Sequence, residues 1–124
     1  MLIDSHAHLD DERFDKDRDL LIKSLKENGI DLVINVGADL ASSIKSVSLS
    51  QQYENIYAAI GVHPHSAKEM DESTIDVLKS FAGREKVVAI GEIGLDYYYD
   101  NSPRDIQRQR FIEQLELAKE VDLP

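Results

Sequence analysis

Two histidines one residue apart, His6 and His8, follow the first apolar run of the chain. Residues i and i+2 of a β-strand point to the same face, so both imidazoles can bind one metal ion at about 2.0–2.1 Å. Asp4 lies on that face one step earlier, where its carboxylate could hold a ring N–H of a liganding histidine. A pair of histidines without a metal is the alternative. The turn-like residues 9–12 favour the metal site, because α/β folds place their sites at the carboxyl ends of strands.

The other two histidines, His63 and His65, repeat this spacing after a later apolar run, with Pro64 between them. They could ligate a metal, contact a phosphate or cap the next helix. We favour contact with substrate or with the metal ligands over direct ligation, and a loop with exposed histidines is the alternative. All four histidines of the chain follow strand-like runs, which indicates one shared site.

A further apolar run ends in the segment 91–96 (GEIGLD). Glu92 stands there between glycines, which allow a bend or a close backbone approach. Its two oxygens can bridge two metal ions about 3.5–4 Å apart, or it is a salt-bridged turn residue. Asp96 is either an acceptor for a site residue or a loop cap. The run Tyr97–Tyr99 could stack on unpaired bases, but we expect it to pack the loop against helices.

The composition is that of one globular domain. The 124 residues are 42% hydrophobic and 31% charged and contain no cysteine, which excludes disulfides and thiolate metal sites. No apolar run approaches the roughly 18 residues of a membrane span, and the first residues do not resemble a signal peptide, so a cytoplasmic location is expected. The net charge of −10 argues against binding nucleic acid over the whole surface, but not at a site where metal ions neutralise phosphate.

Short apolar runs alternate with helical patterns along the chain. Strands are predicted at 1–4, 30–36, 56–62 and 87–90. Helices are predicted at 14–28, from 40 to about 53, around 75–82, and from Pro103 to near Val121. Gly29 is expected to end the first helix, and Ser102 to cap the last one with Asp105 in its first turn. The last helix is expected to turn inward a stripe of Phe111, Leu115 and Ala118.

Strands that are nearly continuous apolar runs, each followed by a helix, indicate right-handed βαβ units and a parallel sheet. Four such units predict an α/β fold that is the N-terminal half of a TIM-barrel (β/α)8 fold, which typically needs about 250 residues. A small open sheet with helices on both sides is the alternative. A fifth strand is expected to begin at Leu123-Pro124. Residues 1–124 are therefore expected to be a single partial domain that lacks strands five to eight and self-associates through exposed sheet edges.

Three segments resemble the motifs of TatD-family metal-dependent deoxyribonucleases in order and spacing, as does the helix before the expected fifth strand. The three segments are 4–10 (DSHAHLD), 61–65 (GVHPH) and 89–98 (AIGEIGLDYY), and the helix lies within 109–124. The resemblance implies a barrel of the amidohydrolase-like group that hydrolyses DNA phosphodiester bonds with two divalent ions, Mg²⁺, Mn²⁺ or Zn²⁺. DNA would be the partner of the complete protein, and no membrane is expected to be involved.

The same resemblance assigns roles residue by residue. His6 and His8 would be ligands of one metal and Glu92 would bridge the two, with His63, His65 and Asp96 as neighbours that act in catalysis or contact substrate.

Family members continue past this length and supply further ligands, so little or no activity is expected of the 124 residues alone. Two other functions stay open: an amidohydrolase-like enzyme acting on a small ester, amide or lactone, and a non-catalytic half-barrel that assembles with another chain. Glu92 argues against the first, because small-molecule members of this group commonly carry lysine at the fourth strand.

Overall fold

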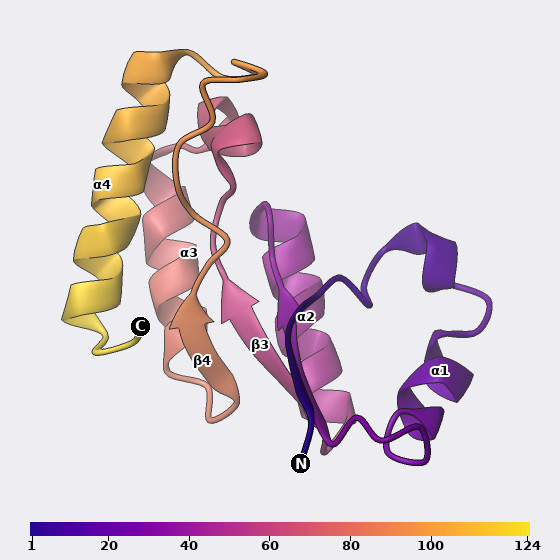
Figure 1. Cartoon of the computed structure of the whole chain (residues 1–124). Coiled ribbons are helices and arrows are strands. Elements are labelled where there is room, and N and C mark those ends of the chain that lie inside the picture. The colour runs from indigo at the N-terminus through magenta and orange to yellow at the C-terminus, as the bar shows by residue number, and fades with distance from the viewer.

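A computed structural model describes residues 1–124 as one parallel sheet covered by helices (Figure 1). The strands are β1 (Ile3–Ala7), β2 (Leu32–Val36), β3 (Ile56–Ile60) and β4 (Val87–Ile90), in the order β1-β2-β3-β4. The helices are α1 (Arg18–Ser24), α2 (Leu40–Gln52), α3 (Glu72–Ala82) and α4 (Arg104–Glu120), with 3₁₀ helices at Glu12–Phe14 and Pro64–Glu69. The predicted α/β fold class is confirmed.

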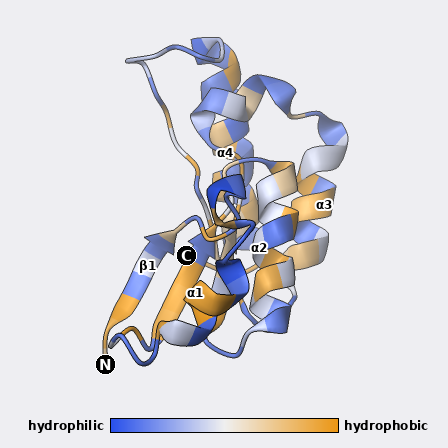
Figure 2. Cartoon of the chain, turned by 90° about the vertical axis from the view of Figure 1, so that its right-hand side faces the viewer, coloured by the Kyte–Doolittle hydropathy of each residue, from blue (hydrophilic) through white to orange (hydrophobic).

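The strand order distinguishes a barrel segment from an open sheet with helices on both faces. Strands follow one another in sequence order, whereas an open doubly wound sheet reverses its order and covers both faces. Helices α2, α3 and α4 lie on one side of the strands, with β1 turned away from them (Figure 2). The open-sheet alternative is therefore wrong, and the four βα units are those of a partial TIM barrel.

Two apolar clusters hold the helices on the sheet. The larger lies between β3, β4 and the helices α2, α3 and α4, and includes Val47, Ile60, Leu78, Val87 and Leu117. The smaller closes α1 over β2 with Leu9, Ile22, Leu25, Val33, Leu49 and Ile56. None of the helices combines the length and the apolar composition needed to cross a bilayer.

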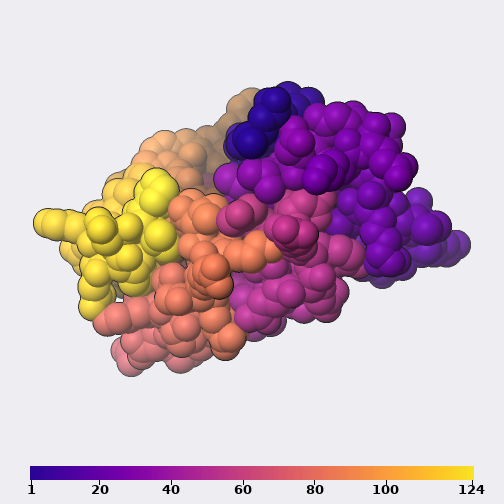
Figure 3. Space-filling view, turned by 90° about the horizontal axis from the view of Figure 1, so that it is seen from below, coloured from indigo at the N-terminus to yellow at the C-terminus, as the bar shows by residue number.

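The end of the chain lies against the free edge of β4. The Ile90 N–H donates to the Pro124 carbonyl at 2.9 Å, which places Pro124 where a next strand would begin (Figure 1). From below, the first residues (indigo) and the last (yellow) lie apart, with segments of intermediate number between them (Figure 3).

Helix α1 is shorter than the predicted 14–28. The Arg18 guanidinium donates to the carbonyls of Leu9, Asp10 and Asp11 at 2.6, 3.2 and 2.9 Å, which holds the preceding segment in turns. Gly29 is expected to end this helix, but α1 ends at Ser24, and Gly29, at φ +85°, lies after the turns that follow it, in a conformation that few other residues adopt.

Helix α4 differs from the prediction at its start and in its buried face. Ser102 does not cap it: its hydroxyl donates to the His65 carbonyl at 2.9 Å and accepts from the Lys68 N–H at 3.1 Å. The buried side chains are Gln107, Gln114 and Leu117, whereas the expected Leu115 is 47% exposed. Glutamine occupies this face because, as described below, each amide meets backbone groups that the loops leave unpaired.

Candidate metal centre

Three candidate ligands converge at the carboxyl ends of β1 and β4. The Nε2 atoms of His6 and His8 are 3.2 Å apart, and His6 Nε2 lies 3.5 Å from Glu92 Oε2. One ligand atom from each residue lies within 4.8 Å of the others. Ligands of one ion at 2.0–2.1 Å, in tetrahedral or octahedral geometry, are about 2.9–3.4 Å apart. The donor set and its spacing therefore fit a divalent cation.

This convergence requires a curved sheet. β1 and β4 are the outer strands, and three strand spacings of a flat sheet would separate them by about 14 Å. Side chains of His6 and Glu92 nevertheless approach within 3.5 Å of one another. The carboxyl ends of the strands therefore bend toward a common axis, as in a barrel.

His8 is oriented for ligation by the backbone of β2. Its Nδ1 lies 2.9 Å from the Val36 carbonyl. A carbonyl can only accept, so Nδ1 carries the proton and the lone pair of Nε2 points toward His6 and Glu92.

We predicted that Asp4 would accept a hydrogen bond from an imidazole N–H, and the structure shows that it does not. Its carboxylate accepts from the backbone N–H of His6 at 3.0 Å. An aspartate two residues earlier easily reaches such an amide, and this local bond replaces the expected one to a ring.

Glu92 is positioned through its backbone. The Glu92 N–H donates to the Gly37 carbonyl, and the Gly91 N–H to the Ile60 carbonyl, both at 2.8 Å. The Gly91–Glu92 peptide is cis. A Cβ added at Gly61 would lie 2.9 Å from the carbonyl carbon of Gly91. The close approach is thus at Gly61 of the neighbouring strand end, and not at Gly91 or Gly94. Gly94 does allow a bend as expected, because its φ is +151°.

His63 faces the other oxygen of Glu92, with its Nε2 3.7 Å from Oε1. Its Nδ1 accepts the His65 N–H at 3.0 Å and so caps the 3₁₀ helix, one of the roles left open above. Burial lowers the pKa of His63 below 6.5, more than the Glu92 carboxylate raises it. Neutral His63 therefore carries its proton on Nε2, as a donor toward the site.

His65 and Asp96 form a hydrogen-bonded pair through Nε2 and Oδ2. The other oxygen of Asp96 accepts the N–H groups of Tyr98 and Tyr99 at 2.9 and 3.3 Å. Burial raises the pKa of Asp96, but the hydrogen bonds from His65 and these two amides outweigh it and hold the pKa below 3.8. Asp96 is thus both an acceptor for a histidine and a loop cap.

Helix α4 fixes the two loops that carry these residues. Gln107 accepts the Asp96 N–H at 2.8 Å and donates to the Asp96 carbonyl at 3.0 Å. Gln114 accepts the Val62 N–H at 2.7 Å and donates to the Val62 carbonyl at 3.1 Å. We did not predict either residue. The sequence feature that could have indicated them is their spacing. The two glutamines are seven residues apart and lie on the same helix face as the apolar residues Leu117 and Ala118.

Four of the predicted site residues line a common hollow, whereas Asp4, His6 and Asp96 do not. A cavity of about 320 Å³ is lined by His8, Ala38, His63, His65, Ser66 and Glu92.

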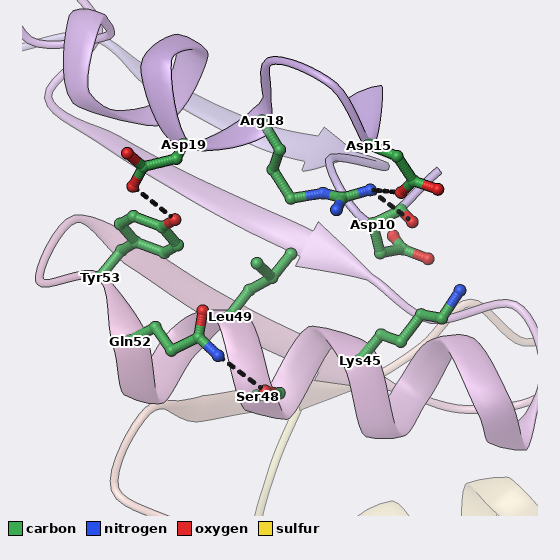
Figure 4. Close-up of a pocket in the computed structure, with 9 residues that line it drawn as sticks. All are labelled: Asp10, Asp15, Arg18, Asp19, Lys45, Ser48, Leu49, Gln52 and Tyr53. Carbon is green, nitrogen blue, oxygen red and sulfur yellow. Dashed lines mark hydrogen bonds and ion pairs between the residues drawn. The ribbon is translucent and has the colours of Figure 1, made fainter. Parts of the chain in front are cut away.

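A second cavity, of about 370 Å³, lies away from this centre between α1 and α2 (Figure 4). Several of its polar groups pair with one another: Arg18 with Asp15 at 2.6 Å, and the Tyr53 hydroxyl with Asp19 at 2.9 Å. It contains none of the predicted site residues, and the contact of Tyr53 with Asp19 links the end of α2 to α1.

Comparison with known proteins adds a family and several relatives. The family model described as "TatD related DNase" matches residues 3–124. An uncharacterised metal-dependent hydrolase of Bacillus subtilis, YabD, is 44% identical over 100% of this chain and 49% of its own length. A protein of Cronobacter sakazakii named 3′-5′ ssDNA/RNA exonuclease TatD is 35% identical over 99% of this chain and 47% of its own.

Solved structures agree. The crystal structure of the TatD homologue YjjV of Escherichia coli superposes with a TM-score of 0.89 at 32% identity, over 99% of this chain and 48% of that one. An uncharacterised amidohydrolase of Saccharomyces cerevisiae, at 22% identity and a TM-score of 0.80, shares the fold. The chain spans about half the length of the curated relatives it matches.

Proposed function

Since this chain belongs to the TatD-related DNase family, we propose that it supplies metal ligands to a hydrolase that cleaves DNA phosphodiester bonds. The observation that carries the proposal is the convergence of His6, His8 and Glu92, whose ligand atoms lie within 4.8 Å of one another. The exonuclease named among the relatives acts on single-stranded DNA and RNA, which supports a nucleic-acid substrate.

In this proposal His6 and His8 bind one divalent ion, Mg²⁺, Mn²⁺ or Zn²⁺, and Glu92 bridges to a second ion in the complete protein. Such ions, when bound, polarise the phosphoryl oxygen and lower the pKa of bound water. The Val36 carbonyl holds the His8 ring with its Nε2 lone pair toward the ion. The Nε2–H of His63 points into the same space and is suited to donate to a phosphate oxygen.

His65 and Asp96 act on the other side of the hollow. Asp96 holds the Nε2 of His65, so the imidazole is fixed beside His63, with the two ring centroids 4.2 Å apart. We propose that this pair contacts the substrate and takes no part in binding the first ion.

We further propose that residues 1–124 are one partial domain, the first four of eight βα units, and that alone they hydrolyse DNA little or not at all. They bring together three candidate ligands, and they match about half of each relative. The exposed apolar side chains at the start of β1, such as Leu2 at 59% and Ile3 at 47%, support self-association along that edge. Sedimentation at several concentrations tests this last point, and a monomer throughout contradicts it.

Metal binding by the 124-residue chain tests the ligand assignment directly. Mn²⁺ titrated by calorimetry should bind, and a concentration about 100 times Kd should raise the free energy of unfolding by about 2.7 kcal/mol. His6→Ala, His8→Ala and Glu92→Gln should each weaken binding, whereas Glu116→Gln on the exposed face of α4 should not. Equal Mn²⁺ affinity in all four variants would refute the assignment.

Hydrolysis of a single-stranded oligodeoxynucleotide by the protein that carries these residues tests the reaction. Activity should require a divalent ion and fall strongly in His6→Ala and Glu92→Ala. Cleavage of small esters or lactones in place of the oligonucleotide would favour the amidohydrolase alternative.

A further inference from the structure

Of the three tyrosines that follow Asp96, Tyr97 packs against a helix as expected, through Arg104 and Arg108 of α4, whereas Tyr98 and Tyr99 do not pack against α4. Tyr98 is 85% exposed and Tyr99 66%, and only Tyr97, at 39%, contacts α4. The backbone here forms a turn, because Asp96 accepts the N–H groups of Tyr98 and Tyr99. The loop projects beyond the carboxyl ends of the strands (Figure 1).

The two exposed rings stand on a rigid support. Gln107 fixes both backbone groups of Asp96, and Asp96 in turn holds the turn under Tyr98 and Tyr99. The Tyr98 and Tyr99 rings meet edge-on, with centroids 4.7 Å apart and planes at 90°, so they do not stack on each other. A ligand that stacks on these rings would therefore order little of the protein, which reduces the entropic cost of binding.

The rings are continuous with the candidate metal centre. The Tyr99 ring meets His65 edge-on at a centroid distance of 5.7 Å, and His65 meets His63 at 4.2 Å. His63 faces Glu92. A chain that runs along these rings would thus extend from the exposed tyrosines to the candidate ligands.

Positive charge lies at the adjacent Tyr97, in a chain whose net charge is −10. The Arg104 guanidinium lies over the Tyr97 ring at 4.5 Å and pairs with Asp100 at 2.8 Å. Arg108 contacts the Tyr97 hydroxyl at 3.3 Å and forms no ion pair, so it is available to a phosphate.

We propose that Tyr98 and Tyr99 form a stacking platform for unpaired bases of single-stranded nucleic acid, with Arg108, which contacts the adjacent Tyr97, available for a phosphate. Aromatic faces next to an arginine are the means by which proteins bind single strands without reading their sequence. Duplex DNA does not fit, because its bases already stack on one another. The inference rests on the proposed function for the identity of the strand, but its test needs neither metal nor hydrolysis.

Binding of a labelled oligothymidylate to the 124-residue chain in EDTA, followed by fluorescence anisotropy, tests the platform. Tyr98→Ala and Tyr99→Ala should each weaken binding by about 5- to 150-fold, as expected for loss of one base–aromatic stack. Tyr98→Phe should keep the affinity, because the ring remains. Leu20→Ala, at a 71% exposed position on α1, is the matched surface control and should bind as the parent does.

The outcomes separate the platform from the reaction. An unchanged affinity in both alanine variants, or equal binding of an abasic oligonucleotide, would overturn the platform, since bases would then contribute nothing. If the parent binds no oligonucleotide and Tyr98→Ala loses a self-associated state, the tyrosines form an interface between copies of the chain. This result would also overturn the platform. The protein could also show no metal-dependent hydrolysis while the alanine variants still lose affinity for the oligonucleotide. That result would contradict the proposed function but would support the platform.

Discussion

Gln107 and Gln114 lie seven residues apart on the buried face of α4, and each satisfies the N–H and the carbonyl of a single loop residue, Asp96 and Val62 respectively. Two turns of a helix rise about 10.5 Å, so α4 sets the spacing between the loops that carry His65 and its partner Asp96. A side chain that pairs both groups of one residue resists both its translation and its rotation.

Replacing Gln114 with methionine should lower the free energy of unfolding by about 2–4 kcal/mol, because it leaves two buried backbone groups unpaired. Gln109→Met, on the exposed side of the same helix, should change it by less than about 0.5 kcal/mol. Urea denaturation followed by circular dichroism measures both, and similar midpoints for the two variants would contradict this role.

Gln114→Glu should show a pH-dependent defect. A carboxylate there would face the Val62 and Arg110 carbonyls, which lie 3.1 and 3.2 Å from Gln114 Nε2, and burial and repulsion would raise its pKa in the folded state. The protonated acid can donate as glutamine does. The loss of stability relative to the parent should therefore be small near pH 4 and grow as pH rises through the folded pKa. A loss that is constant from pH 4 to 8 is the opposing result.

Asn35 should couple stability to metal binding. It is fully buried, accepts the Leu9 N–H at 2.5 Å, and donates to Asp10 at 2.8 Å and Ser46 at 2.7 Å. Asn35→Asp would set a second carboxylate against Asp10 and should cost about 2–4 kcal/mol, with weaker Mn²⁺ binding because Leu9 follows His8. Asn28→Asp, on an exposed turn, is the control. Unaltered Mn²⁺ affinity in a folded Asn35→Asp variant would show that the two are independent.

Gly61 and Gly83 should respond in opposite directions to alanine. A Cβ at Gly61 would lie 2.9 and 3.0 Å from Gly91 and Ile93, so Gly61→Ala should cost about 1–3 kcal/mol and displace Glu92. A Cβ at Gly83 meets nothing within 4 Å and its φ is −78°, so Gly83→Ala should be neutral or stabilise by up to about 1 kcal/mol. Thermal denaturation and Mn²⁺ titration of both variants check the contrast.

Asp71 should contribute stability that acid removes. Its side chain caps α3, and hydrogen bonds from the Ser73 hydroxyl and backbone N–H lower its pKa below 3.8. The contribution is therefore complete above the unfolded pKa and is lost as pH falls through the lower, folded value. In a carboxyl NMR titration, Ser73→Ala should raise the pKa of Asp71, and an unchanged titration would contradict the assigned cause.

The strand ends and their chemistry were predictable, because apolar runs and the residues that follow them are local signals. Val87–Ile90 has its predicted bounds, and the polar residues after it lie where the end of a parallel strand places them. The positions of the site residues follow from topology in the same way, while their roles as ligands stay predictions.

The details that depend on unpaired backbone groups were not predictable. The sequence predicts Ser102 as a helix cap, but its hydroxyl donates a hydrogen bond to the carbonyl of His65 instead. Gln107 reads as a surface residue, although a loop distant in sequence occupies both ends of its amide. In each case a tertiary partner outcompetes the local one, and periodicity contains no information on that partner.

The candidate ligands come from the first and the last strand of the sheet, His6 from β1 and Glu92 from the end of β4. A cation held by both would therefore act as a cross-link between the two edges that fray most easily. Amide hydrogen exchange should then slow together in β1 and β4 when metal is added, and much less in the central strands β2 and β3. Metal binding at this site would therefore require that both edge strands of the sheet are folded.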